Sequence, residues 1–486
     1  MRLNVEEVAM HQRSRERRDG VFPASDEARA NKRFLRQLTA IATLGALLFG
    51  FDTGVISGAL IYLREDLRLT SVAEGLVVAS LLFPGATSGA LLGGPIADRF
   101  GRRASLISCA VLFAVGVLAC SLAPDVATLV VARVVLGFAV GCASVACPLY
   151  LAELAPSSKR GRMVAVNQLM ITVGLFLSFS SNVLFDQFAH GPAVWRYMIG
   201  IAIIPAIAFF LGMLSLPDTP RWYAGKGRLE QCRETLARAH SAEDAEFEYR
   251  QIVEIAQRET NEATILWTML RVLGEQAWMR RLLWIGIVLA VAQQTTGINV
   301  VMYYAPTVLE ESGMTGSASL VASLAVGLEQ VLLTFVGIWL LGFMGRRKMM
   351  LFGFFGVAVS HGLLAMSYLL PESTLRSYLI LLFMVGVSAS MVTFVGSTGF
   401  VVLSEIFPLA IRGFAMGASI CGLWVANSLI SFFFPILAEG VGSVAVFVGF
   451  TGLNLLVWLF VFRAIPETKG RTLEELEADF RSGRKD

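Results

Sequence analysis

Charged residues are scarce in this chain. Only 16% of its 486 residues are Asp, Glu, Lys or Arg, whereas 55% are hydrophobic. Typical soluble domains contain about 25% charged residues, so this composition excludes an ordinary soluble protein. The formal net charge is only +3. The positions of the basic residues, given below, indicate that this charge reflects membrane topology. We therefore expect no nucleic-acid partner.

Cysteine and histidine, which often bind metals or act in catalysis, are also scarce. No two of the six cysteines have metal-ligand spacing, and the four histidines are scattered along the chain. The sequence contains neither a nucleophile with an adjacent base nor a phosphate-binding loop. We therefore expect no enzyme activity, no metal and no cofactor. For His361, which lies in an apolar run, packing is our interpretation and a proton relay is the alternative.

Long apolar runs are the main feature that is present. A membrane-spanning helix needs about 20 mostly apolar residues, and twelve such runs divide six and six around a polar segment at 217–281. The sequence therefore predicts an all-α membrane protein with twelve transmembrane helices in two six-helix bundles. The predicted spans are 39–62, 76–97, 104–123, 126–151, 163–186, 196–216, 282–308, 317–341, 349–370, 378–403, 411–437 and 442–464.

Three short motifs occur once in each half of the chain, in the same order. Their copies lie 252, 244 and 249 residues apart. A duplication whose copies lie on one side of a membrane requires an even number of spans per half, which is the plan of a two-domain transporter. The pairs are Glu153-Leu-Ala-Pro156-Ser-Ser-Lys-Arg160-Gly161 with Glu405-Ile-Phe-Pro408-Leu-Ala-Ile-Arg412-Gly413, Gly101-Arg102-Arg103 with Gly345-Arg346-Arg347, and Pro217-Asp218-Thr219 with Pro466-Glu467-Thr468.

The basic residues predict the orientation. The predicted spans place 35 of the 40 Lys and Arg residues on one side of the membrane. Loops rich in Lys and Arg are cytoplasmic, so we expect both termini and the polar segment in the cytoplasm. The opposite side carries only Arg64, Arg68, Arg196 and Arg376, and Arg133 remains inside a span.

These boundaries divide the chain into five segments. We expect residues 1–30 and 478–486 to be disordered, and the helical periodicity of the polar segment predicts short helices there. The segments are a cytoplasmic N-terminal tail at 1–37, a first six-helix bundle at 38–216, cytoplasmic linker helices at 217–281, a second six-helix bundle at 282–464 and a cytoplasmic C-terminal tail at 465–486.

Five motifs in consecutive order resemble the sugar porter family of the major facilitator superfamily, over about residues 38–476. The resemblance implies the major facilitator fold and a multi-pass protein of the plasma (inner) membrane, whose partners are a sugar, a proton and the lipid bilayer. The motifs are Gly93-Gly94-Pro-Ile-Ala-Asp98-Arg99-Phe-Gly101-Arg102-Arg103, Pro148-Leu-Tyr150-Leu-Ala-Glu153 with Arg160-Gly161-Arg162, Pro217-Asp-Thr-Pro220-Arg221-Trp222, Gln293-Gln294-Thr-Thr-Gly297-Ile-Asn299 with Tyr303-Tyr304, and Pro466-Glu467-Thr468-Lys469-Gly470.

Asp52 and Arg133 are charged residues in otherwise apolar spans. A charge at the bilayer centre costs about 2.5–3.5 kcal/mol on insertion scales, so such residues pair or line a cavity. Both lie in the outer halves of their spans, and equal depth predicts that they are in contact. A change in their separation can move a proton, whereas a static ion pair is the alternative. Proton-coupled sugar porters resemble this chain in having Asp at this position, which favours symport.

A set of side-chain amides suits a sugar, because amides both donate and accept hydrogen bonds without adding charge. On a helix Gln293 and Gln294 point in different directions, whereas Gln293, Thr296 and roughly Asn299 or Val300 share one stripe. Structural bonds between helices are the alternative. The resemblance favours sugar contacts and places the Trp424 indole against the sugar's C–H surface. The implied substrate residues are Gln168, Gln293, Gln294, Asn299, Tyr303, Gln330, Phe400, Trp424 and Asn427.

Several positions depart from the family pattern. Phe400 stands where relatives often have Trp, Gln330 stands where Asn is common, and Leu423 occupies a position sometimes filled by Gln. These differences imply a reshaped site, which leaves the identity of the sugar open. Glu329 lies near the middle of a span where many relatives are apolar. We interpret it as a neutral structural carboxyl bonded to another helix, with substrate selection or a second proton as the alternatives.

Charged repeats at the predicted cytoplasmic helix ends indicate a gate. Ion pairs there can hold the two bundles together while the substrate site opens outward, and separate when it opens inward. Charges that only set topology and are solvated independently are the alternative. Gly342 replaces the second-half counterpart of Asp98, so we expect an asymmetric latch. The expected gate residues are Asp98, Arg99, Arg102, Glu153, Arg160, Arg346, Glu405 and Arg412.

The residues and the resemblance together predict proton-coupled symport of a monosaccharide, a hexose or a pentose, by alternating access. Within this class, the alternatives are a cyclitol or polyol porter, for example for a compound like myo-inositol, and an uncoupled sugar facilitator. A drug or metabolite antiporter is the alternative of another class. Its cavity is expected to lack the constellation of Gln293, Gln294 and Asn299.

Overall fold

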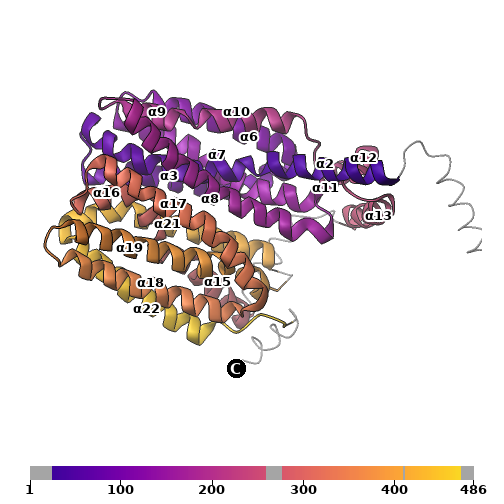
Figure 1. Cartoon of the computed structure of the whole chain (residues 1–486). Coiled ribbons are helices and arrows are strands. Elements are labelled where there is room, and N and C mark those ends of the chain that lie inside the picture. Colours follow the sequence, from indigo (N-terminus) through magenta and orange to yellow (C-terminus); the bar gives the residue numbers. More distant parts are fainter. Residues whose placement is uncertain (1–23, 259–275, 409–410, 472–486) are drawn as a thin grey trace, which may run out of the picture.

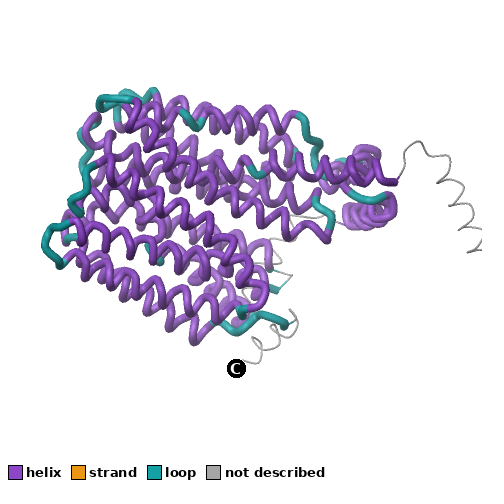
Figure 2. The backbone as a smooth tube through the Cα atoms, viewed as in Figure 1, coloured by secondary structure: helices purple, strands orange, loops and turns teal. Residues whose placement is uncertain are grey.

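The computed structural model describes residues 24–258, 276–408 and 411–471, and every element in these ranges is a helix (Figures 1 and 2). Twelve of the helical segments are long and apolar enough to cross a membrane. Because a backbone in hydrocarbon must pair its N–H and C=O groups internally, helices are the expected solution. The predicted all-α fold with twelve spans is confirmed.

The first six spans precede a group of short polar helices, and the other six follow it. The first half contains α2 (Ala24–Ala42), α3 (Leu44–Asp66), α4 (Ser71–Ser80), η1 (Leu81–Ala86), α5 (Thr87–Phe100), α6 (Arg102–Ser121), α7 (Val126–Leu154), α8 (Ser157–Phe188), α9 (Val194–Gly200) and α10 (Ile203–Leu214). The short polar helices are α11 (Pro220–Gly225), α12 (Leu229–Ala239) and α13 (Ala242–Arg258). The second half contains α15 (Ala277–Thr295), α16 (Ile298–Glu311), α17 (Gly316–Phe343), α18 (Arg346–Tyr368), α19 (Thr374–Ser390), η2 (Met391–Gly396), α20 (Ser397–Ile406), α21 (Arg412–Val441) and α22 (Ser443–Ala464).

The two halves form two bundles that meet along one part of their length. Helix α16 packs on α3, α17 packs on α8, and α21 packs on α4. At the last contact a Cβ on Gly75 would lie 2.4 Å from the carbonyl oxygen of Phe432, so only glycine permits this approach. In Figure 1 the bundles lie together near α16 and diverge toward α11 and α15. We call the divergent end, which carries residues 98–103, 157–162 and 346–348, the basic end.

Helix α2 extends the first span beyond the basic end (Figure 1). The expectation of disorder through residue 30 is wrong for residues 24–30, which are helical. The reason is a contact with the linker helices: Asn31 donates to the carbonyl of His240 at 2.7 Å, and the Arg238 guanidinium lies over the Phe34 ring. The linker helices themselves were predicted. Residues 1–23, 259–275 and 478–486 lie outside the described ranges.

The seventh span is not one continuous helix. Helix α15 ends at Thr295, Gly297 has a φ of +72°, and α16 begins at Ile298. A left-handed residue interrupts a right-handed helix, and glycine adopts this conformation without steric cost. The predicted stripe of Gln293, Thr296 and roughly Asn299 or Val300 assumed an unbroken helix. It is wrong beyond Thr296, because the break at Gly297 separates Asn299 and Val300 from the first two residues.

Candidate functional site

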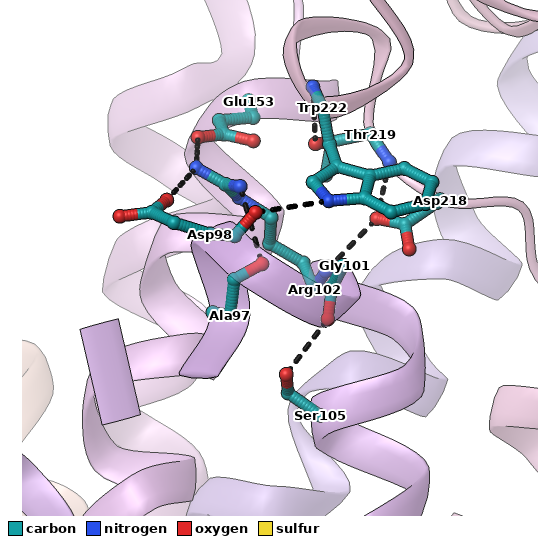
Figure 3. Close-up of polar contacts among 9 residues, drawn as sticks. All are labelled: Ala97, Asp98, Gly101, Arg102, Ser105, Glu153, Asp218, Thr219 and Trp222. Atoms are coloured by element: carbon teal, nitrogen blue, oxygen red, sulfur yellow. Dashed lines mark hydrogen bonds and ion pairs between the residues drawn. The ribbon is translucent and has the colours of Figure 1, made fainter. Parts of the chain in front are cut away.

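Residues of the repeated motifs gather at the basic end of the first bundle (Figure 3). Arg102 forms ion pairs with Asp98 at 2.7 Å and with Glu153 at 3.1 Å. Its backbone N–H donates to Asp218 at 3.0 Å, as does that of Arg103 at 3.2 Å. These amides open α6 and have no partner within the helix, so the Asp218 carboxylate caps it and faces the positive end of its dipole.

Asp218 is almost completely buried in this position. Burial raises the pKa of its carboxyl group above the usual range, although the N–H groups of Thr219, Arg103 and Arg102 act in the opposite direction. The Trp222 indole N–H covers the same turn by donating to the Asp98 carbonyl at 3.2 Å. The cluster therefore joins α5, α6, α7 and the segment after α10 within one bundle.

The second bundle repeats this arrangement with different residues. Glu467 accepts a hydrogen bond from the backbone N–H of Arg346 at 2.7 Å, as Asp218 does from Arg102. The Arg346 guanidinium pairs with Glu405 at 3.3 Å, and the Thr468 hydroxyl donates to the same carboxylate. The three sequence repeats thus converge in space in both halves.

The two clusters differ where Gly342 replaces the counterpart of Asp98. Among the described residues the Arg102 guanidinium has two carboxylate partners, whereas the Arg346 guanidinium has one. At this place in the second cluster, the Lys469 ammonium group donates to the Gly342 carbonyl at 3.2 Å. The second cluster therefore has a basic residue bound near the place where the first has an acid.

The described ion pairs of the predicted gate residues all lie within one bundle or the other. Arg99 is exposed and lies over the Phe100 ring, and the side chain of Arg412 lies outside the described set. Arg160 is partly buried and acts electrostatically on Glu248 of α13, whose pKa is lowered chiefly by a hydrogen bond from His240. Because the bundles diverge at this end, a latch between them stays a prediction for another state.

A second polar group lies inside the first bundle, between α3 and α7. Arg133 Nη1 and Asp52 Oδ1 are 3.6 Å apart, and both side chains are at most 4% exposed. Asp52 Oδ2 and Arg133 Nε and Nη2 have no hydrogen-bond partner within the described part of the chain. The predicted contact between these residues is thus present, but it leaves much of their hydrogen-bonding capacity unmet.

The predicted substrate amides on the seventh span separate into two groups. Asn299 donates its side-chain N–H to Gln294 Oε1 across the break at Gly297. Gln293 points elsewhere and meets α20, where a Cβ on Gly399 would lie 2.2 Å from Gln293 Oε1. Asn299 therefore lies beside Gln294, whereas the sequence placed it on the same side of the helix as Gln293.

Tyr303 connects the two bundles near these residues. It is buried, lies on α16, and its hydroxyl interacts with Thr53 of α3 and with Asn427 of α21. Thr53 directly follows Asp52, so Tyr303 links the neighbourhood of the buried ion pair to a predicted substrate residue. Trp424, one turn before Asn427, packs on Phe49 of α3 with ring centroids 5.7 Å apart.

The remaining predicted substrate residues have no described contact with the Gln294–Asn299 pair. Gln168 on α8 is exposed, and Phe400 on α20 is 45% exposed. Gln330 on α17 is buried, and its side-chain N–H lies 2.7 Å from the sulfur of Met302. Among the predicted substrate residues, the structure joins Gln294 to Asn299, and separately joins Tyr303 to Asn427, which lies one turn after Trp424 on α21.

Glu329 lies between helices of the second bundle. Both of its carboxylate oxygens are shielded from solvent and have no hydrogen-bond partner among the described residues, and the same holds for Ser388 Oγ on the neighbouring α19. The bond to another helix that a structural carboxyl would make is not seen among the described residues, so the role of Glu329 stays a prediction.

Some residues of these sites were missed by the sequence predictions. Asp218 and Glu467 belong to the clusters at the basic end but were not among the predicted gate residues, although the repeated Pro-acid-Thr motif was a sufficient signal. Thr53 was also missed, and its only signal was its position beside Asp52 in an apolar span.

Comparison with known proteins gives consistent matches. The family described as sugar (and other) transporter matches residues 38–480. The chain is 41% identical over 453 residues to the major myo-inositol transporter IolT of Bacillus subtilis, covering 92% of this chain and 95% of that one. It is 36% identical over 469 residues to the galactose-proton symporter of Escherichia coli K12, covering 95% and 98%. The inward open conformation of the xylose transporter XylE from E. coli matches with a TM-score of 0.78 and 31% identity, covering 92% and 99%.

Asp218→Ala is expected to destabilise the first bundle much more than Asp98→Ala. The first change leaves the N–H groups of Arg102, Arg103 and Thr219 without their acceptor, at a cost of about 1–3 kcal/mol. The second removes a carboxylate that is 56% exposed, and exposed ion pairs contribute about 0–1 kcal/mol. Thermal unfolding of the two purified variants in detergent measures both losses of stability. Equal decreases in melting temperature would contradict the capping role of Asp218.

Glu329→Gln is expected to transport with nearly normal pH dependence, because an amide keeps the shape and polarity of a neutral carboxyl. Glu329→Leu leaves Ser388 facing an apolar group and is expected to be poorly expressed or inactive. Uptake by the Gln variant across about pH 5 to 8 checks this. A lost or displaced pH optimum would instead show that Glu329 titrates during transport.

Proposed function

Because the chain belongs to the sugar transporter family of the major facilitator superfamily, we propose that it couples uptake of a monosaccharide, a hexose or a pentose, to proton entry. The protein lies in the plasma membrane with both termini in the cytoplasm, as the 35 basic residues on one side indicate. The basic end is then cytoplasmic, and the divergence of the bundles there corresponds to an inward-facing state.

The observation that carries the proton-coupling proposal is the ion pair of Asp52 and Arg133. Its single contact of 3.6 Å joins two almost fully buried side chains. Desolvating two charges is costly, and attraction offsets that cost only with good geometry and further hydrogen bonds, which Asp52 Oδ2 lacks. A proton on Asp52 removes its charge and weakens the pair, so binding and release of a proton change the forces between α3 and α7.

Tyr303 offers a route by which this change reaches the substrate. Its hydroxyl interacts with Thr53, beside Asp52, and with Asn427 on the other bundle. A shift of α3 that accompanies protonation therefore alters the contact with Asn427. Coupling in this scheme depends on differential contacts in two states of the bundles, as alternating access requires.

Sugar recognition is supported by the uncharged polar groups near this route. The side chains of Gln294, Asn299 and Asn427 can both donate and accept, which matches the hydroxyl groups of a sugar. The Trp424 ring supplies a flat apolar surface for the C–H face of the same ligand. None of these groups carries a charge, which favours a neutral polyhydroxylated substrate.

A cyclitol is the second candidate substrate. Phe400 lacks the indole N–H that the family often supplies at its position, so one donor to a pyranose is missing. The relative named as the major myo-inositol transporter is 41% identical to this chain. Competition of unlabelled D-xylose, D-galactose and myo-inositol for uptake of each labelled compound decides between the two substrate classes.

Asp52→Asn is expected to abolish accumulation against a gradient while leaving downhill exchange of the substrate largely intact. The amide keeps the shape of the carboxylate but cannot release a proton. Uptake in a transport-deficient host, with and without a proton ionophore, measures the loss. Glu65→Gln, which changes an exposed acid on the same helix, serves as the control. An Asn variant that still accumulates substrate and alkalinises the medium would exclude Asp52 as the coupling site.

Gln294→Ala is expected to weaken substrate binding by about 1–3 kcal/mol, because Asn299 loses its partner and the substrate loses an amide. Delivery to the membrane should remain normal. Equilibrium binding of the transported compound gives the affinity. Ser323→Ala serves as the control, because it removes a hydroxyl that bonds only its own helix at 2.8 Å. Unchanged affinity in the Gln294 variant would remove this residue from the site.

A further inference from the structure

The break in the seventh span leaves backbone carbonyl groups that a continuous helix would satisfy. In an unbroken α-helix the N–H of Val300 would donate to the carbonyl of Thr296. Here that N–H donates to Gly297 at 3.0 Å instead. Buried carbonyls without a partner are costly in an apolar environment, so the break requires donors from elsewhere.

Two buried side chains from other helices supply those donors. His361 Nε2 on α18 lies 2.8 Å from the Thr296 carbonyl oxygen. The Asn454 side-chain N–H on α22 donates to the Thr295 carbonyl at 3.1 Å. Because a carbonyl can only accept, Nε2 of His361 must carry the hydrogen. Consecutive carbonyls at the end of α15 are thus held by two separate helices.

The His361 ring is fixed in the orientation that this bond needs. It is fully buried and stacks on Phe450 at 5.1 Å and on Phe447 at 5.8 Å, with interplanar angles of 19° and 18°. A Cβ on Gly297 would lie 2.9 Å from His361 Nε2. The imidazole therefore occupies the space that the glycine leaves open, and the break and the ring fit one another.

His361 and Asn454 therefore lie beside the two amide side chains that flank the break. Gln294 lies before Gly297 and Asn299 lies after it, and their side chains bond to each other. Their relative position is determined by the backbone dihedral angles of the residues between them. Those angles are restrained by the bonds that His361 and Asn454 make to Thr296 and Thr295.

We propose that His361 and Asn454 are positioning residues that hold the broken seventh span in the geometry that joins Gln294 to Asn299. His361 then acts through its N–H and not as a packing ring alone. Its Nδ1 is buried without a partner in the described chain. The part of the proposal that concerns ligand affinity rests on the proposed function.

The backbone effect can be tested without any ligand. His361→Phe keeps a stacked ring but removes the donor, whereas His361→Gln keeps an amide N–H of similar reach. Hydrogen–deuterium exchange of the purified protein, followed in peptides covering residues 293–303, should rise about tenfold in the Phe variant and stay near the wild-type rate in the Gln variant. Asn454→Leu should raise exchange in the same peptides.

Ser367→Ala provides the matched control, because it removes a buried hydroxyl that bonds only within α18 at 2.8 Å. Unchanged exchange in His361→Phe, or an equal rise in the Phe and Gln variants, would overturn the proposal and leave packing as the role of the ring. If the Phe variant does not fold, Asn454→Leu carries the test, and wild-type exchange in that variant would overturn it.

A second readout concerns binding, with D-xylose, D-galactose and myo-inositol as the probes. The affinity of whichever probe binds the wild-type protein should fall about tenfold in His361→Phe and recover in His361→Gln, with an unchanged pH profile of uptake in the Gln variant. If no probe binds the wild-type protein, the proposed substrate class is wrong, while the exchange measurement still decides the role of His361.

Discussion

Within the hydrocarbon of a membrane, a backbone or side-chain polar group can be satisfied only by another protein group. This requirement explains why the described spans are helices. It also means that a helix can be interrupted only where other groups replace the lost backbone hydrogen bonds. The carbonyls at the end of α15 receive them from His361 and Asn454. At the basic end, where α6 begins, its first amides receive their acceptor from Asp218.

The duplication of the chain is visible in the partners of the helix ends. Asp218 and Glu467 occupy corresponding places at the ends of their bundles and accept from the N–H groups of Arg102 and Arg346. Such clusters tie the helices of each bundle to one another, whereas the proposed transport cycle needs motion between the bundles. Rigid bundles that rock about a shared site are what alternating access requires.

The sequence predicted the spans, the two bundles and the contact of Asp52 with Arg133, because apolar length and equal depth determine them. It did not predict the partner of Asn299, since the periodicity argument assumed a helix without a break at Gly297. The role of His361 could not be found from the sequence either. A single histidine in an apolar run gives no indication of which carbonyl lies opposite, because that depends on the packing of α18 against the seventh span.

In the proposed mechanism a proton gradient drives the substrate through a cycle in which Asp52 changes its charge. Purified protein in liposomes, with a pH gradient of about one unit and the membrane potential clamped at zero, tests it most directly. One proton per substrate predicts accumulation approaching about tenfold, since one pH unit is worth about 1.36 kcal/mol. D-Xylose, D-galactose and myo-inositol are the substrates to compare. Accumulation of the transported compound toward that ratio, lost in Asp52→Asn, is the predicted result; equilibration to equal concentrations by the wild-type protein would contradict the account.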